Sequence, residues 1–159
     1  MITNDTETND EYKDGVRYRV TVSKPVIGGG SAAEKRINGF ITKMTEKYKK
    51  DAENASGYNY CRLKYTVKCE KPLSILFESE KRGKGVFSYA PFAVTFDEKG
   101  GLTPFRAGKA LKKEIKRFFS ENGVRVKNKD ITYSYYIDGD DVVVFAKMRR
   151  GILCYTVKS

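Results

Sequence analysis

The chain has 159 residues and a formal net charge of +11, from 31 lysines and arginines against 20 aspartates and glutamates. This length fits a single domain, and an apolar fraction of 40% is enough to build its core. Histidine and tryptophan are absent, so the chain lacks the commonest general base and metal ligand and the best aromatic platform for a sugar or a cation. A basic surface favours anionic partners, namely nucleic acid, anionic lipid, wall polymers or an acidic protein.

The cysteines give no metal motif. Cys61, Cys69 and Cys154 include no Cys-x-x-Cys pair, and three thiols without histidine make a poor zinc set. We therefore expect thiols that act as small apolar residues, with no metal and no cofactor. No apolar run reaches the ~18 residues of a membrane span, and the first 20 residues are too polar for a signal peptide. The protein is then either cytoplasmic or a soluble fragment whose signal or anchor was trimmed.

Residues 1–15 are predicted to form a flexible acidic tail, because they are rich in Asp, Glu, Asn and Thr and almost free of apolar side chains. A first strand is predicted over residues 16–22, where Val and Tyr alternate with Arg and Thr. Lys24-Pro25 should end this strand, since proline has no amide hydrogen to donate.

A glycine run, Gly28-Gly29-Gly30, follows the strand. It lacks the Lys-Ser/Thr pair of a phosphate-binding loop, so we interpret it as a turn. Ser31 and Glu34 then form a capping box, which predicts an amphipathic helix over residues 32–50.

The stretch over residues 60–96 is predicted to be the main sheet. Polar and apolar side chains alternate over residues 60–69, as in a strand with one buried and one wet face. The buried face would carry Cys61, Leu63, Tyr65, Val67 and Cys69. The wet face would carry Tyr60, Arg62, Lys64, Thr66 and Lys68. Strands over residues 73–77 and 86–96 continue the sheet, joined by a charged connection at residues 78–85.

The last third predicts one more helix and a β meander. Thr103-Pro104 is a good helix start, and an apolar stripe runs over residues 107–122. Strands over residues 131–137, 142–148 and 152–157 follow, with hairpin turns at 138–141 and 149–151. The fold class is therefore α+β: an antiparallel β-sheet with two amphipathic α-helices packed on one face, forming a single domain over residues 16–159.

Two groups of residues are candidates for binding. The wet face of the 60–69 strand offers Tyr60, Arg62, Lys64 and Lys68. The second helix carries a basic face of Lys109, Lys112, Lys113, Lys116 and Arg117, which is either a solvated helix side or an anion-binding surface. Arg149-Arg150 and Lys81-Arg82-Lys84 sit in predicted turns and would extend such a surface. No spacing indicates an activated nucleophile or an acid pair, so we predict no catalytic residues and no enzyme activity.

The order of these elements resembles a known family. The matching features are Ile37-Asn38 in the first helix, a Leu-Ser-Ile segment at residues 73–75, a return strand ending in Thr95-Phe96-Asp97, and the run from Tyr136 to Phe145. The chain resembles the bacterial domain of unknown function found in the ectodomain of the lysozyme-responsive anti-sigma-V factor and near the N-terminus of a peptidoglycan deacetylase. The resemblance covers about residues 16–148. It implies an extracytoplasmic α+β unit of the cell envelope.

Two functions are carried forward. The first is a non-catalytic binding module of the bacterial cell envelope that recognises a protein or an anionic polymer. The alternative is a cytoplasmic basic nucleic-acid-binding protein. The sequence leaves the ligand and the oligomeric state open.

Overall fold

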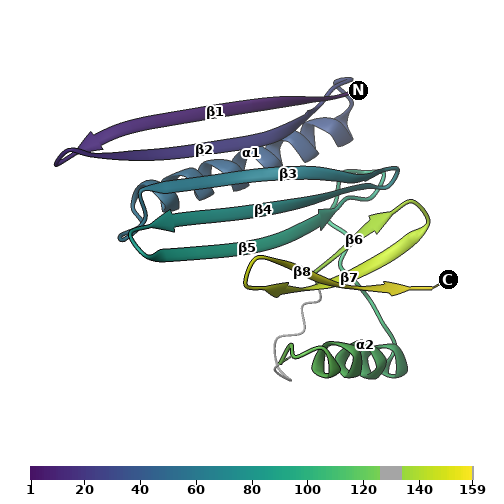
Figure 1. Ribbon diagram of the computed structural model, residues 1–159. Helices are drawn as coiled ribbons and strands as arrows, with labels where there is room; N and C mark the ends of the chain where they lie inside the picture. Colours follow the sequence, from purple (N-terminus) through teal and green to yellow (C-terminus); the bar gives the residue numbers. More distant parts are fainter. Residues whose placement is uncertain (126–133, 159) are drawn as a thin grey trace.

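A computed structural model describes residues 1–125 and 134–158 as four layers, with α1 on a five-stranded sheet, a three-stranded sheet on its other face, and α2 outermost (Figure 1). The first half of the chain comprises β1 (Ile2–Lys13), β2 (Val16–Ile27), α1 (Ala32–Glu53), β3 (Tyr60–Glu70), β4 (Leu73–Gly83) and β5 (Val86–Thr95). The second half comprises α2 (Lys109–Glu121), β6 (Ser134–Asp138), β7 (Asp141–Met148) and β8 (Gly151–Val157).

The five-stranded sheet has the order β1-β2-β3-β4-β5 and is mixed. β2 and β3 are parallel because α1 carries the chain across between them, and every other neighbouring pair is antiparallel. α1 begins at the Ser31–Glu34 capping box and covers one face of the sheet. The core on that face is built from Ile37 and Ile41 of α1 against inward residues such as Leu63, Ile75 and Phe77 of the sheet.

The three-stranded sheet has the order β6-β7-β8 and is antiparallel. Its outer face packs against α2, where Ile115 and Phe119 contact Tyr135 and Val144. Its inner face packs against the five-stranded sheet through Tyr136, Val143 and Phe145, which meet Leu76 of β4. Alternate residues of β6 and β7 therefore pack into two different hydrophobic cores, as expected for a sheet between two layers.

Two buried hydroxyl groups lie at the junction of the sheets. Ser74 Oγ and Thr95 Oγ1 are 2.8 Å apart, and Ser74 Oγ also accepts a hydrogen bond from the Ile137 amide at 3.0 Å. Ser74 is fully buried and Thr95 is 2% exposed. The hydrogen bond from the half-buried Ile137 therefore ties β6 to the buried hydroxyl of β4.

The structure corrects three predictions about local structure. Residues 1–15 are not a flexible tail, because residues 2–13 form β1 and pair with β2 along its whole length. Lys24-Pro25 does not end β2, which continues to Ile27 with Pro25 buried inside it. α2 begins after Gly108, and Thr103 instead donates its amide hydrogen to the carbonyl oxygen of Thr95.

The prediction that both helices pack on one face of a single sheet also differs from the structure. α1 and α2 cover different sheets, and the last three strands form a separate sheet rather than extending the first. The antiparallel pairing, the two amphipathic helices and the α+β class agree broadly with the prediction. The predicted strand over residues 131–137 appears as β6 from Ser134, and residues 131–133 lie outside the described part of the chain. The single-domain expectation stays a prediction. Among the described helices, none is long and apolar enough to cross a membrane.

Candidate functional site: a groove lined by arginines

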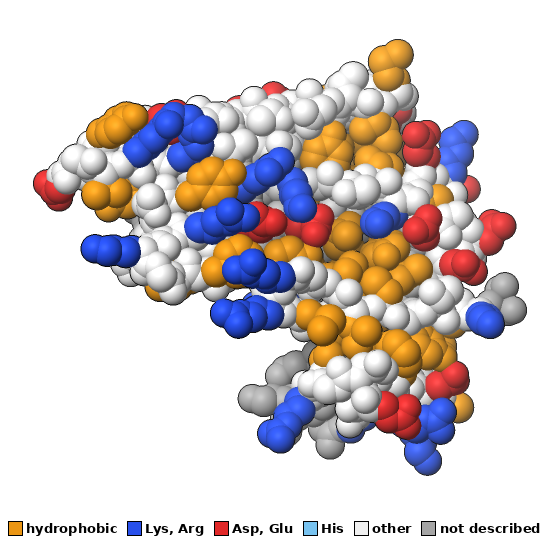
Figure 2. Space-filling view, viewed as in Figure 1, with side chains coloured by type: hydrophobic (Ala, Val, Ile, Leu, Met, Phe, Trp, Pro, Cys, Tyr) orange, Lys and Arg blue, Asp and Glu red, His pale blue; other side chains and the backbone are white. Residues whose placement is uncertain are grey.

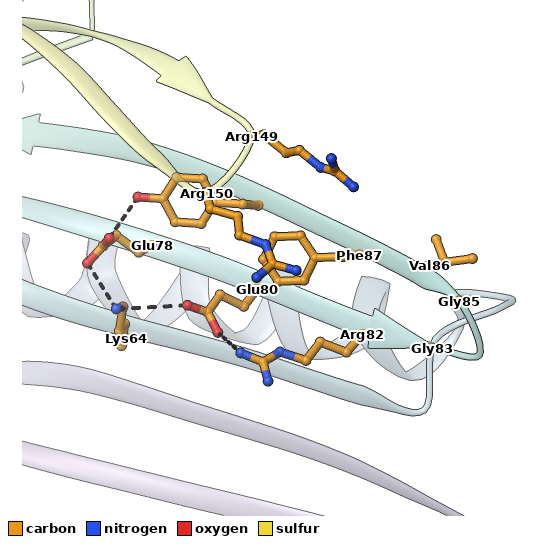
Figure 3. Close-up of a pocket in the computed structure, with 11 residues that line it drawn as sticks. Lys64, Glu78, Glu80, Arg82, Gly83, Gly85, Val86, Phe87, Arg149 and Arg150 are labelled. Atoms are coloured by element: carbon orange, nitrogen blue, oxygen red, sulfur yellow. Dashed lines mark hydrogen bonds and ion pairs between the residues drawn. The ribbon is translucent and has the colours of Figure 1, made fainter.

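A groove of about 720 Å³ lies where the β4–β5 hairpin meets the β7–β8 turn (Figure 3). It opens on the face of the five-stranded sheet that α1 does not cover. Its lining residues are Lys64, Glu78, Glu80, Arg82, Gly83, Gly85, Val86, Phe87, Tyr89, Arg149 and Arg150. Four cationic side chains face two carboxylates, which leaves the groove with two net positive charges.

The floor of the groove is a chain of polar contacts across β3, β4 and β5. Lys64 Nζ lies 3.5 Å from Glu78 and 3.9 Å from Glu80, and Glu80 also pairs with Arg82 at 3.3 Å. Tyr89 donates its hydroxyl hydrogen to Glu78 at 2.7 Å. Burial, together with this hydrogen bond, raises the pKa of Tyr89, so the hydroxyl keeps its proton at neutral pH. The floor carboxylates are thus matched by cations of the floor itself.

One wall of the groove is a stack of side chains around Phe87. The Arg82 guanidinium carbon lies 5.7 Å from the ring centroid, and that of Arg150 lies 5.0 Å from it. Both distances are in the range of a cation–π interaction. Phe87 therefore links the β4–β5 hairpin to the β7–β8 turn and holds Arg150 over the floor (Figure 3).

The arginines of the turn have no acidic partner among the residues that the structure describes. Within the described residues, Arg149 makes no ion pair, and Arg150 makes only its contact with Phe87. Arg62 on the same face of β3 is exposed and likewise unpaired within the described chain. A guanidinium group carries five N–H donors in a rigid fork that matches the oxygens of a carboxylate or a phosphate. These groups are therefore available to an oxyanion from solution.

The residues predicted to bind on β3 have different surroundings in the structure. Lys64 lines the groove but is already paired with two glutamates. Lys68 lies over the ring of Tyr136, with Nζ 4.8 Å from the centroid, and Tyr60 is half-buried. Arg62 alone of this set is exposed without a partner in the described chain.

The basic face of α2 lies apart from the groove, on the far side of the three-stranded sheet (Figure 1). Lys109, Lys112, Lys113 and Arg117 are exposed there, and Lys116 is partly buried. Arg117 pairs with Glu121 at 3.6 Å within the helix. The two predicted surfaces are therefore separate.

Seven residues of the groove were absent from the predicted binding set: Glu78, Glu80, Gly83, Gly85, Val86, Phe87 and Tyr89. Glu78 and Glu80 were assigned to a charged connection, yet β4 continues through them to Gly83. Their alternation with buried Phe77 and Ser79 was the available signal that they belong to a strand with one wet face.

The acidic hairpin turn of the second sheet is exposed. Asp138, Asp140 and Asp141 surround the turn between β6 and β7, as predicted. Within residues 1–125 and 134–158, no three acidic or cysteine side chains are grouped so that they hold a metal ion.

Comparison with known proteins shows which solved structures share this fold. No protein-family model matches the chain, and no curated protein matches it significantly. A crystal structure of a DUF3298 family member from Bacteroides fragilis superposes with a TM-score of 0.60 at 13% identity, covering 98% of this chain and 90% of that one. A DUF3298 family protein from Pseudomonas aeruginosa gives a TM-score of 0.58 at 9% identity, covering 91% and 82%. The fold is thus one seen in a bacterial domain of unknown function, as predicted, and the link to the anti-sigma-V ectodomain stays a prediction.

Proposed function

We propose that the protein is a non-catalytic binding module of the bacterial cell envelope that takes an acidic protein segment or an anionic polymer in the groove. The observation that carries this proposal is the pair Arg149–Arg150, which overhangs a floor whose own charges are already matched. A ligand that supplies oxyanions to these arginines completes ion pairs that the described chain leaves open. Hydrogen bonds to charged groups contribute about 1.5–3 kcal/mol each, so two such contacts support measurable affinity.

The shared fold supports an envelope role only indirectly. The two structural neighbours are bacterial, and the sequence resembles an extracytoplasmic family. Fractionation of cells that express the full-length gene product with a C-terminal tag tests the location. Recovery of the protein with the cytoplasmic enzymes alone would contradict an envelope role.

Binding is tested with two polyanions, poly-L-glutamate and inorganic polyphosphate, by isothermal titration calorimetry at low and at physiological salt. We expect binding at low salt that weakens as salt is added. Replacing both Arg149 and Arg150 by Ala should weaken it by about tenfold or more. The matched control replaces Lys109 and Lys113 by Ala, which removes the same charge from α2, and it should change affinity less than threefold, about 0.6 kcal/mol. Equal losses in the two variants would show that net charge, not the groove, does the binding.

The alternative, a cytoplasmic nucleic-acid-binding protein, is favoured by the net charge of +11. Single-stranded oligonucleotides test it in the same titration. The logarithm of the association constant should then fall with the logarithm of salt concentration with a slope of about −0.7 per phosphate neutralised. No binding at low salt would exclude this alternative.

A further inference from the structure

Arginine and lysine are distributed differently over this protein. The chain has ten arginines and 21 lysines. Six of the arginines share the uncovered face of the five-stranded sheet or the turn above it: Arg17, Arg19, Arg62, Arg82, Arg149 and Arg150. Only one lysine, Lys64, lines the groove. We call these six residues the arginine band. In Figure 2, basic side chains gather on the half of this face nearest the β1–β2 and β7–β8 turns, with acidic side chains between them.

The arginine band crosses the strands rather than following one of them. Arg17 and Arg19 lie on β2, Arg62 on β3 and Arg82 on β4, and the β7–β8 turn reaches over β5. Neighbouring strands are about 4.8 Å apart, so the stretch from β2 to β5 spans about 14 Å. The groove is therefore one end of a longer surface that crosses β2 to β5, with Arg17 and Arg19 at its other end.

The end of the band on β2 shows how its arginines bind an oxyanion. Arg17 donates to both oxygens of Asp10 at 3.2 and 2.9 Å, and Arg19 donates to the same oxygens at 2.8 and 3.0 Å. One carboxylate of β1 thus receives two bidentate guanidinium groups. Arg62, Arg149 and Arg150 present the same donors without an internal acid in the described chain.

The aromatic side chains of the groove offer little free ring face, whereas Tyr12, opposite Arg17 at the β1–β2 end of the band, is 69% exposed. Arg82 and Arg150 both lie against the Phe87 ring, and Tyr89 is only 4% exposed. Tyr60 is half-buried in its strand. Proteins that bind single-stranded nucleic acid gain about 1–3 kcal/mol per base from stacking on such rings, so the stretch from Arg150 to Arg62 suits a polyanion that carries no bases.

The floor adds a second requirement. Glu78 and Glu80 keep lone pairs that accept hydrogen bonds from a ligand, although Lys64 and Arg82 already match their charges. A chain that alternates an anionic group with hydroxyl groups satisfies both parts of the site, because its hydroxyls donate to the floor while its anions meet the arginines. Phosphodiesters joined by polyols have this chemistry.

We infer that the arginine band binds a linear polyol-phosphate polymer of the cell envelope, laid across the strands from Arg150 past Arg62. This inference rests on the proposed function and names the ligand class for the same site. The arginine forks hold successive phosphates, and the floor glutamates accept hydrogen bonds from the polyol.

The test compares three probes by fluorescence anisotropy at low salt: poly(glycerol phosphate), poly-L-glutamate of matched charge, and single-stranded oligothymidylate. We expect poly(glycerol phosphate) to bind about tenfold more tightly than the other two. Arg62 lies outside the groove lining, so Arg62→Ala should weaken this binding by about tenfold, and Arg62→Lys, which keeps the charge but loses the fork, by an intermediate factor. Lys109→Ala is the matched single-charge control, and thermal melts of all variants check folding.

The outcomes separate the inference from the proposed function. If poly-L-glutamate binds as tightly and only the Arg149/Arg150 variant loses it, the polymer class is wrong and the groove proposal stands. Unchanged affinity in Arg62→Ala contradicts a track beyond the groove. Tightest binding to oligothymidylate overturns both the polymer class and the envelope role. No binding by any probe overturns the groove itself.

Discussion

The hydroxyl of Ser74 offers the sharpest test of how the two sheets are held together. Ser74→Ala removes the acceptor of the Ile137 amide hydrogen bond and leaves that half-buried N–H without its partner. An orphaned buried donor costs about 1–3 kcal/mol, and loss of the hydrogen bond with Thr95 adds about 1 kcal/mol. We therefore expect a loss of about 2–4 kcal/mol in the free energy of unfolding. Alanine keeps the Cβ, so little packing is lost.

The assay is urea unfolding followed by circular dichroism at neutral pH. With a urea dependence of about 2 kcal/mol per molar, the midpoint should fall by about 1–2 M. Ser23→Ala is the matched control, because its hydroxyl pairs with Thr6 at 3.0 Å on the exposed face, and it should cost less than about 0.5 kcal/mol. Thr95→Val combined with Ser74→Ala should cost less than the sum of the single changes, since both remove one shared hydrogen bond. A midpoint for Ser74→Ala within error of the wild type would refute the reasoning.

Three further predictions concern substitutions at Tyr48, Gly83 and Gly39. Burial raises the pKa of Tyr48 to about 12, so above pH 10 the unfolded chain loses this proton before the folded one, and stability should fall between pH 10 and 12. Tyr48→Phe should reduce that fall in urea midpoints measured across the same pH range. Gly83→Ala would place a Cβ 1.8 Å from the carbonyl oxygen of Gly57, a backbone clash that should cost about 2 kcal/mol or more in the same urea assay. The added Cβ of Gly39→Ala in α1 meets nothing within 4 Å. This change should increase the free energy of unfolding by about 0.5–1 kcal/mol and so raise the melting temperature.

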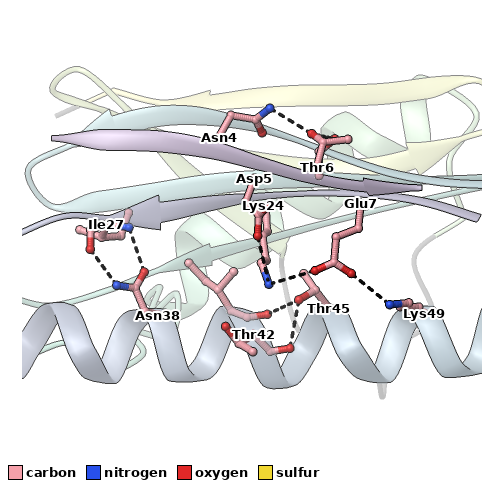
Figure 4. A network of polar contacts seen from close by, with 12 residues as sticks. Asn4, Asp5, Thr6, Glu7, Lys24, Ile27, Asn38, Thr42, Thr45 and Lys49 are labelled. Carbon is pink, nitrogen blue, oxygen red and sulfur yellow. Dashed lines mark hydrogen bonds and ion pairs between the residues drawn. The ribbon is translucent and has the colours of Figure 1, made fainter. Parts of the chain in front are cut away.

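The N-terminal strand shows where pattern reasoning failed. Strand prediction depends on alternating apolar residues, and the side of β1 that faces α1 is polar. Glu7 contacts Lys49 of α1 at 3.0 Å, and Lys24 lies 3.5 Å from Asp5 (Figure 4). The hydrogen bond and charge of Lys49 lower the pKa of Glu7. Such exposed pairs contribute little stability, so backbone pairing with β2 is what places β1.

A local signal for this hairpin was nevertheless present in the sequence. Asp14-Gly15 is a preferred pair for a two-residue hairpin turn, and both residues adopt the positive φ values, 51° and 77°, that this turn needs. The prediction for residues 1–15 rested on their acidic, polar composition and did not use that signal. Turn chemistry was therefore more informative than composition at this end of the chain.

The helices and central strands were predictable for a different reason. The Ser31–Glu34 capping box and the 3.6-residue apolar period are local properties, and the structure confirms α1 from its first turn. The division between two sheets was not predictable, because β6 and β7 alternate in the same way whether their second face meets a helix or a sheet. Only the partner of each face distinguishes these arrangements, and that partner is a tertiary property.

The groove was predictable only in its parts. Arg82, Arg149 and Arg150 were recognised as basic turn residues, but the convergence of Arg82 and Arg150 on Phe87 requires the β7–β8 turn to dock over β5. The α2 lysines had the more regular spacing in the sequence and yet lie on another surface. Helical periodicity shows which side chains share a face, and it carries no information about which distant turn lies opposite.

The groove lies at the junction of the two sheets. The contacts that hold the sheets together therefore also position the arginines that we propose bind a ligand. At one end of the junction, the buried Ser74 holds Ile137 by a hydrogen bond. At the other end, the β7–β8 turn rests on the five-stranded sheet through the contact of Arg150 with Phe87, which is only partly buried. Buried hydrogen bonds are costly to break, whereas contacts near solvent are weaker and easily exchanged. An oxyanion that binds Arg149 and Arg150 therefore adds its contacts at the more exposed end of this junction.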